Sequence, residues 1–311
     1  MSLIASTSIL NIAHRGARAY APENTLAAFA KAKSFGCQMF ELDARLSKDE
    51  VVVVYHDEHL KRCTDAENRF SGRDSYQVSD FTYKELATLD AGNWYIKELS
   101  LPIDQRQPFL QSLSDIELSQ YVTETELKDY SSGNIKIPTL TETLCLAKEL
   151  GIMINVELKS NHANDSVLVK SVLQAIQAMN MEAHILISSF NHDLLKPVRH
   201  QNKKIATAIL IDQPLSNPIS HLRKLKANAY NLGCYHDYRT DKFDSKSGNR
   251  YLSHIKKLRT AGFDVNIWTC NDQEEMGHLI AAGVSGLITD YPNRVKAKLY
   301  EFLNNKTLSL S

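Results

Sequence analysis

The 311-residue sequence has few of the features that mark disulfide-rich, membrane-spanning or disordered chains. Its five cysteines lie far apart and form no C-x-x-C pair, which argues against a disulfide framework and against a zinc cage. No window approaches the roughly 18 apolar residues of a membrane span, and 12 glycines with 8 prolines leave little room for disorder. Residues 1–10 lack the basic and apolar regions of a secretory signal. We therefore expect a folded, cytoplasmic protein with no integral membrane segment.

The formal net charge is zero, because 36 basic residues balance 36 acidic ones. Proteins that bind nucleic acids or membrane surfaces usually carry an excess of one sign of charge. We therefore expect no nucleic-acid partner. The composition leaves the oligomeric state open.

Eight short apolar runs alternate with segments of helical periodicity. The runs lie at 10–13, 39–44, 152–158, 185–188, 205–211, 229–232, 265–268 and 286–289. The helical segments lie at 25–35, 140–150, 166–179, 252–261, 272–282 and 294–303. Eight strands alternating with helices predict an α/β protein with a parallel sheet that closes into a (β/α)8 TIM barrel. An open doubly wound sheet is the alternative, but no glycine-rich phosphate loop follows any of the runs.

The alternation is interrupted once, between about residues 58 and 137. This stretch has mixed polarity, and a structureless loop of such length is uncommon in a compact domain. We therefore expect one domain over 1–311 with a small inserted subdomain after the second strand. The insertion is expected to overhang the barrel mouth, and the role of its part at about 97–136 stays open.

The first strand ends contain carboxylates where active sites of such barrels lie. Glu41 and Asp43 are two residues apart in a strand, so their side chains point to the same face. Two carboxylates in a packed interior repel each other and lose their solvation unless a cation lies between them. With Glu157 they form a set of hard oxygen ligands that suits Mg²⁺ or Ca²⁺. The sequence therefore predicts one divalent cation held by these three residues.

Basic and imidazole side chains accompany the carboxylates. Arg15 offers a bidentate fork and Lys159 a point charge, and both suit a phosphate group. His14 and His56 can exchange protons near neutral pH. Together with a cation, this set indicates phosphoryl chemistry.

Five short strings resemble, in order and spacing, the signature of glycerophosphodiester phosphodiesterases. They are His14-Arg15-Gly16, Pro22-Glu23-Asn24-Thr25, Glu41-Leu42-Asp43, His56-Asp57 and Val156-Glu157-Leu158-Lys159. The alternation of strands and helices extends the resemblance over nearly the whole chain.

The resemblance implies roles for seven residues. Glu41, Asp43 and Glu157 would bind the metal, His14 and His56 would be the acid/base pair, and Arg15 and Lys159 would bind phosphate. It also implies a two-step hydrolysis through a cyclic phosphate that yields glycerol 3-phosphate and an alcohol. The sequence does not indicate which histidine acts first or which alcohol leaves.

Structural alternatives exist for most of these residues. Glu41 and Asp43 could form a buried ion network with Arg15 and Lys159 in the absence of metal. Glu157 could likewise form a plain salt bridge with Lys159.

Other polar and aromatic positions have weaker patterns. Asn24 or Thr25 is expected to cap the first helix, and a substrate contact from Asn24 is the alternative. Trp268, near the end of the run 265–268, either contacts the glycerol or the leaving group or packs in the core. Asp290 is expected to cap the last helix. The nine histidines other than His14 and His56 are expected on the surface, without partners.

Other functions remain open beside the hydrolysis of small glycerophosphodiesters. A lysophospholipase D-like or phospholipase C-like enzyme acting on lipid headgroups would need an apolar rim. Phe109, Leu110, Leu113 and Tyr121 could supply that rim. A non-catalytic barrel that binds phosphoesters is the alternative from another class, but it would need neither the histidines nor the carboxylates.

Overall fold

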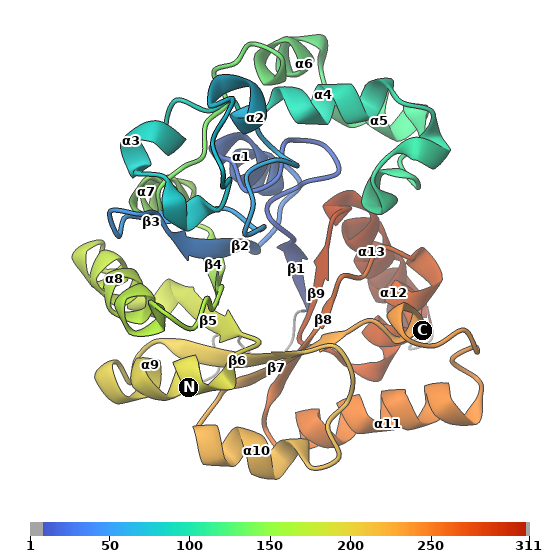
Figure 1. Ribbon diagram of the computed structural model, residues 1–311. Helices are drawn as coiled ribbons and strands as arrows, with labels where there is room; N and C mark the ends of the chain where they lie inside the picture. The colour runs from blue at the N-terminus through green and yellow to red at the C-terminus, as the bar shows by residue number, and fades with distance from the viewer. Residues whose placement is uncertain (1–8, 309–311) are drawn as a thin grey trace.

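Eight parallel strands form a closed barrel in the computed structural model of the chain, which describes residues 9–308 (Figure 1). The barrel strands are β1 (Leu10–Ala13), β2 (Met39–Leu46), β4 (Met153–Leu158), β5 (Ile185–Ser189), β6 (Ala206–Ile211), β7 (Ala229–Gly233), β8 (Asp264–Trp268) and β9 (Gly286–Thr289). β1 pairs with both β2 and β9, which closes the sheet. The predicted (β/α)8 barrel is therefore confirmed.

A ninth strand, β3 (Val52–Val54), lies outside the barrel and pairs antiparallel with β2. It was not among the eight predicted strands. Because β3 runs back along β2, the chain that follows it returns to the level of Asp43, whose carbonyl accepts a hydrogen bond from the backbone N–H of Tyr55 (2.9 Å). This reversal brings His56 to the same end of the barrel as the carboxylates of β2.

Helices surround the barrel (Figure 1). They are α1 (Leu26–Ser34), α7 (Leu140–Leu150), α8 (Asp165–Ala178), α9 (Leu195–Gln201), α10 (Pro218–Leu225), α11 (Lys246–Thr260), α12 (Gln273–Ala282) and α13 (Pro292–Leu308). Thr25 caps α1 and Thr139 caps α7 through side-chain oxygens that accept backbone N–H groups. The sequence analysis did not find α9 and α10. α9 is short and contains Pro197, and α10 buries only Leu222 and Leu225. Within residues 9–308, none of the helices combines the length and the apolar character that crossing a membrane requires.

The barrel interior changes from apolar to charged along the strands. Buried apolar side chains, among them Ile12, Met39 and Ala208, form a cluster inside the barrel. On β2, Met39 is followed at the spacing of two by Glu41 and Asp43, toward the carboxyl end of the strand. The charged groups thus gather at the end where barrel active sites lie.

The segment between β3 and α7, residues 55–139, contains short helices that lie together at the top of Figure 1. They are α2 (Ala66–Arg69), α3 (Tyr83–Leu86), α4 (Asn93–Ser100), α5 (Asp115–Tyr121) and α6 (Glu124–Tyr130), with the 3₁₀ turns η1 (Val78–Asp80), η2 (Ile103–Gln105) and η3 (Pro108–Leu110). Tyr95 of α4 donates a hydrogen bond to the carbonyl of Ala19 (2.7 Å), which ties the segment to the loop after β1. That this segment is a separate inserted subdomain stays a prediction.

The apolar side chains of this segment face inward. Phe109, Leu110 and Leu113 are buried, and Tyr121 is half-buried against the core. These four residues therefore do not supply the exposed apolar rim that a lipid-headgroup enzyme would need. They hold the segment against the barrel instead.

Candidate active site

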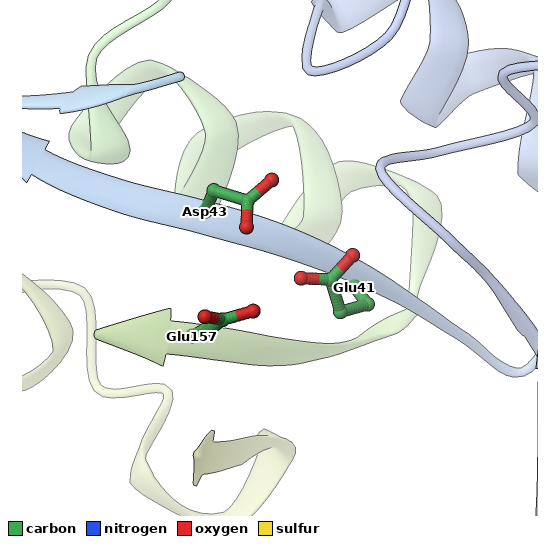
Figure 2. Close-up of side chains that lie close together, drawn as sticks. All are labelled: Glu41, Asp43 and Glu157. Atoms are coloured by element: carbon green, nitrogen blue, oxygen red, sulfur yellow. The ribbon is translucent and has the colours of Figure 1, made fainter. Parts of the chain in front are cut away.

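Three carboxylates converge at the carboxyl ends of two neighbouring barrel strands. Glu41 and Asp43 come from β2, and Glu157 of β4 lies opposite Asp43 in the strand register. Figure 2 shows the three side chains pointing into a common space, and one oxygen atom from each lies within 4.8 Å of the others. All three residues are buried. The structure thus brings together the three predicted metal ligands.

Two basic side chains partly neutralise this cluster. The Lys159 Nζ lies 3.0 Å from a carboxylate oxygen of Asp43 and 2.7 Å from one of Glu157. The Arg15 Nε lies 3.4 Å from Asp43. Burial raises the pKa of Asp43, but the neighbouring positive charges, Lys159 foremost, outweigh it and hold that pKa well below its usual range. The ion pairs considered as a structural alternative are therefore present for Asp43 and Glu157.

Glu41 is the member of the cluster that has no ion pair with a lysine or arginine side chain among the described residues. Its Oε2 accepts the backbone N–H of Arg15 (2.9 Å), whereas its buried Oε1 accepts no hydrogen bond from residues 9–308. Burial, followed by repulsion from Asp43 and Glu157, raises the pKa of Glu41 well above its usual value. A divalent cation between the three carboxylates would remove this cost, and the all-oxygen ligand set fits Mg²⁺ or Ca²⁺.

His14 pairs with a carboxylate from the far end of the sequence. Its Nδ1 lies 2.8 Å from Asp290, which follows β9 and also binds the guanidinium of Arg18. Burial raises the pKa of Asp290, but the charges of Arg18 and His14 hold it well below its usual range. Because the ionised carboxylate accepts the proton on Nδ1, the Nε2 of His14 is free to accept a proton. Burial, and then the charge of Arg18, lowers the pKa of His14 to about 4.

His56 has a matching partner in the next residue. Its Nδ1 lies 2.6 Å from Asp57, and Asp57 in turn accepts a hydrogen bond from the Arg62 Nε (2.6 Å). Arg45 donates two hydrogen bonds to the His56 carbonyl (2.9 and 2.7 Å), which fixes the backbone there. Burial lowers the pKa of His56, although neighbouring carboxylates oppose the shift. The side chain of His56 is 31% exposed and that of His14 is 11% exposed, so His56 is nearer to solvent.

Two residues of the loop before α1 connect these groups. Glu23 accepts hydrogen bonds from Arg15 (2.9 Å) and from Arg62 (2.6 Å). Asn24 donates a hydrogen bond to the carboxylate of Asp43 (2.7 Å) and has a left-handed backbone, with φ 56°. Asn24 therefore orients Asp43, a predicted metal ligand. This role differs from both roles expected from the sequence, a helix cap and a substrate contact.

The charged groups open into a cavity of about 160 Å³. Asn155 and Arg18 also line this cavity. The remaining lining residues are Phe190, Leu210, Trp268, Thr269 and Ile288. The rings of Phe190 and Trp268 meet edge to face, with centroids 5.3 Å apart, and Trp268 donates a hydrogen bond to the carbonyl of Asn231 (3.1 Å). Trp268 thus presents an aromatic surface to the cavity and also packs against the apolar cluster inside the barrel, so its contact with substrate stays a prediction.

The partners that orient the two histidines were not predicted from the sequence. The expectation that Asp290 caps the last helix is wrong, because its carboxylate binds His14, Arg18 and Asn271. Its position directly after a barrel strand was the available signal. Arg45 was also missed, although it continues the spacing of two from Asp43 along β2.

The expectation that the remaining histidines have no partners is wrong for three of them. His192 Nδ1 lies 2.9 Å from His221 Nε2, and His236 Nδ1 lies 3.1 Å from the carboxylate of Glu275. None of the three lines the cavity of the candidate active site.

A barrel with carboxylates, two histidines and two basic side chains at one end has the features of a phosphoryl-transfer enzyme, and comparisons with known proteins agree. Residues 14–294 match the model of the glycerophosphoryl diester phosphodiesterase family. The glycerophosphodiester phosphodiesterase of Caldanaerobacter subterraneus subsp. tengcongensis is 30% identical over 283 residues, which cover 91% of this chain and 94% of that protein. The human lysophospholipase D GDPD1 is 27% identical, with coverage of 94% of this chain and 86% of that protein.

Solved structures show the same fold. The phosphodiesterase OLEI02445 of Oleispira antarctica, in complex with the product sn-glycerol-3-phosphate, superposes with a TM-score of 0.70 at 23% identity. The match covers 93% of this chain and 95% of that one. The chain belongs to the glycerophosphoryl diester phosphodiesterase family, and it is therefore a hydrolase of phosphodiesters.

Proposed function

We propose that this enzyme hydrolyses small glycerophosphodiesters to glycerol 3-phosphate and an alcohol, with one divalent cation and two histidines. Family membership and the relative from Caldanaerobacter support the substrate class. Glycerol 3-phosphate is the product bound in the Oleispira structure, which has the same fold. We also propose a cytoplasmic location, which the free thiols of all five cysteines support and which fractionation of cells that produce a tagged chain would test.

The observation that carries the proposal is the matched environment of the two histidines. Both His14 and His56 have their Nδ1 atoms fixed by an aspartate, within 2.8 Å for Asp290 and 2.6 Å for Asp57. Each aspartate is in turn held by an arginine. A carboxylate on Nδ1 fixes the tautomer and leaves Nε2 to exchange protons. Both rings line the same cavity, so each can act on one bond of a single phosphodiester.

The reaction needs two proton transfers in each of two steps. In the first step, one histidine accepts the proton of the glycerol 2-hydroxyl, whose oxygen attacks phosphorus. The other histidine donates a proton to the departing alcohol oxygen as its bond to phosphorus breaks, and a cyclic phosphate forms. In the second step water attacks phosphorus and gives its proton to the second histidine, and the first histidine returns its proton to the 2-oxygen as the bond from that oxygen to phosphorus breaks. One water is consumed and both histidines regain their starting states.

Arg15 and Lys159 bind the phosphate oxygens in this proposal. Both line the cavity, and both positive charges are retained because neighbouring carboxylates raise the pKa of Lys159 and of Arg15 against the effect of burial. Their contacts with Asp43 hold them at the edge of the acidic cluster. A phosphate there would meet two basic side chains placed before it arrives.

The cation would be held by Glu41, Asp43 and Glu157, and the buried oxygen of Glu41 that accepts no hydrogen bond supports this site. A divalent ion there would neutralise the developing charge on the phosphoryl oxygens. Mg²⁺ and Ca²⁺ both fit an all-oxygen set.

The first test is release of glycerol 3-phosphate from glycerophosphocholine, glycerophosphoethanolamine, glycerophosphoglycerol and glycerophosphoinositol. Each would be assayed with Mg²⁺, with Ca²⁺ and with a chelator. We expect release that the chelator abolishes and that one of the two ions restores. Release that is unaffected by the chelator would contradict the metal dependence. Absence of release from all four esters would contradict the proposed substrate class.

A lysolipid is the second candidate substrate. Phe190 is 44% exposed at the cavity and contacts Trp268, which is the apolar surface that an acylated glycerol would meet. The similarity to the human lysophospholipase D supports this reading. Parallel assays of glycerophosphocholine and lysophosphatidylcholine distinguish the two, because only the second would yield lysophosphatidic acid.

A further inference from the structure

A second cavity, of about 400 Å³, adjoins the candidate active site, and Lys159 lines both. One wall comes from the segment after β3 and the other from the loop between β4 and α8. We call it the alcohol cavity and define it by Arg45, Glu58, Gln77, Ser79, Lys159 and Asn164, which are among its lining residues.

The alcohol cavity lies on the His56 side of the site. Glu58 is two residues beyond His56, and Arg45, another lining residue, binds the His56 carbonyl at 2.9 and 2.7 Å. Neither histidine ring lines the alcohol cavity itself, but His14 has no such neighbours among its lining residues: it belongs to the loop after β1 and pairs with Asp290, which follows β9.

The lining is mainly polar, and several of its groups are available for hydrogen bonds. The side chains of Gln77, Ser79 and Asn164 make no hydrogen bond to another residue within 9–308. Arg45 and Lys159 are positive and Glu58 is negative, so the lining contains both signs of charge. No phenylalanine, tyrosine or tryptophan is among the lining residues, so a quaternary ammonium would find no aromatic face.

The walls are fixed by hydrogen bonds within each of the two lining segments. The Asp165 carboxylate accepts hydrogen bonds from Ser160 Oγ (2.7 Å) and from the backbone N–H groups of Asn161 (3.1 Å) and His162 (3.2 Å). Across the cavity, the N–H of Val78 donates to the carbonyl of Glu58 (2.8 Å). The cavity is therefore formed before a ligand enters, which lowers the entropic cost of binding.

We propose that the alcohol cavity binds the departing alcohol, and that this alcohol is a neutral, polyhydroxylated one, the class that includes glycerol and inositol. The proposal rests on the hydrolysis proposed above. In an in-line displacement the attacking and departing oxygens lie on opposite sides of phosphorus. An alcohol in this cavity leaves beside His56, and the glycerol 2-hydroxyl then attacks from the side of His14. His14 is the first base and His56 the first acid.

Atoms balance with these roles. The 2-hydroxyl proton passes to His14 as its oxygen bonds to phosphorus, and protonated His56 gives its proton to the alcohol oxygen as that bond breaks. Water then attacks phosphorus and gives its proton to His56, and His14 returns its proton to the 2-oxygen as the bond from that oxygen to phosphorus breaks. No oxidant, reductant or further reactant is needed.

A change of leaving group tests the order of the histidines. The p-nitrophenyl ester of glycerol 3-phosphate releases an anion that needs no proton, so the first acid matters less for this ester. The fold loss of activity caused by His56→Ala should be at least about 10 times smaller with the nitrophenyl ester than with glycerophosphoglycerol. This variant should also accumulate the cyclic phosphate. His14→Ala should lose about equally with both esters. The reverse pattern, or equal losses for both variants, would overturn the assignment.

Substitutions in the alcohol cavity test the ligand class. Gln77→Leu and Ser79→Ala each remove one hydrogen-bonding group, and we expect each to lower kcat/KM about fivefold for glycerophosphoglycerol and glycerophosphoinositol. Glycerophosphocholine and the nitrophenyl ester should change by less than about twofold, since they lack the hydroxyls to be bound. Gln213→Leu and Ser216→Ala are matched controls, because both residues line another cavity, next to Tyr235 and Tyr238.

The outcomes separate the two proposals. If the wild-type protein releases no product from any of the four esters, the hydrolysis proposal itself is wrong. If the wild-type protein is active but the cavity variants leave its preference for polyhydroxylated alcohols unchanged, only the assignment of the alcohol cavity is wrong. A wild-type preference for the choline ester would likewise overturn that assignment.

Discussion

The two halves of the barrel mouth differ in charge. The charged half, at the ends of β1 to β4, contains His14, Arg15, Glu41, Asp43, His56, Glu157 and Lys159. The neutral half, on β5 to β9, contributes Phe190, Leu210, Trp268, Thr269 and Ile288 to the same cavity, whereas Asp290, which follows β9, pairs with His14 and belongs to the charged half.

The difference separates chemistry from binding. Most of the charges on one side lie in a buried cluster, so small changes there would alter the energy of a developing transition state. The neutral side offers aromatic and aliphatic surface, which would stabilise the bound substrate and the transition state alike. Substitutions in the charged half should therefore lower kcat, and those in the neutral half should raise KM.

The largest effect is expected from the histidines. His14→Ala and His56→Ala should each lower kcat for glycerophosphoglycerol by up to about 10⁴-fold, because each removes one proton transfer. Cation affinity, measured by calorimetry, should stay within about twofold of wild type, since neither ring is a proposed ligand. His236→Ala, which breaks a histidine–carboxylate pair outside the mouth, is the matched control. A His14→Ala or His56→Ala variant that hydrolyses glycerophosphoglycerol at the wild-type rate would remove that residue from the mechanism.

Loss of one proposed metal ligand should come next. Glu41→Gln keeps the size of the side chain but removes its charge, and we expect activity to fall about 10³-fold at low cation concentration. Added Mg²⁺ or Ca²⁺ should restore part of that activity because the ligand set is weakened rather than removed. The control Glu275→Gln changes another buried carboxylate, far from the charged half in sequence and bound to Tyr235. If Glu41→Gln bound the cation as tightly as wild type, the three-carboxylate site would be wrong.

Removing the charge that orients His14 should have a smaller effect. Asp290→Asn leaves a group that can still contact Nδ1 but no longer stabilises a protonated ring, so kcat should fall about 10²-fold. Cation affinity should not change, which separates this effect from that of Glu41→Gln. An unchanged kcat would show that Asp290 holds only Arg18.

The same variant should alter the acid stability of the fold. The pKa of Asp290 is held below its unfolded value, mainly by Arg18 and His14 against the effect of burial. Its ionised form therefore stabilises the fold above an unfolded pKa of about 3.9, and this contribution is lost as the pH falls through and below that value. Denaturant titrations should show a shallower fall in the free energy of unfolding below about pH 5 for Asp290→Asn than for wild type. Parallel curves would contradict the shift.

The sequence predicted most of the charged half because its residues stand in short strings on the strands. Glu41 and Asp43 share a face by the period of two, and strand register then places Glu157 opposite Asp43. The closed barrel followed from the number of alternating strands. These features depend on local spacing, which a single sequence displays.

The partners of the histidines could not be predicted in the same way. Asp290 is 276 residues from His14, and a carboxylate after a strand is as typical of a helix cap as of a catalytic pair. The contact exists because β1 and β9 are adjacent only after the barrel closes. His56 likewise reaches the site through the antiparallel strand β3, which the alternation of strands and helices did not indicate.

The smallest effect is expected in the neutral half, at Trp268. Its ring lies against Phe190 and its Nε1 is bound to the Asn231 carbonyl, so the indole is held at the cavity whether or not substrate is present. An aromatic contact contributes about 1 kcal/mol, so Trp268→Ala should raise KM about five- to tenfold and change kcat by less than about twofold. Trp268→Phe should recover most of that affinity because it keeps an aromatic face. If Trp268→Ala instead lowered kcat and left KM unchanged, the neutral half would take part in the transition state, and the division of the mouth into chemistry and binding would fail.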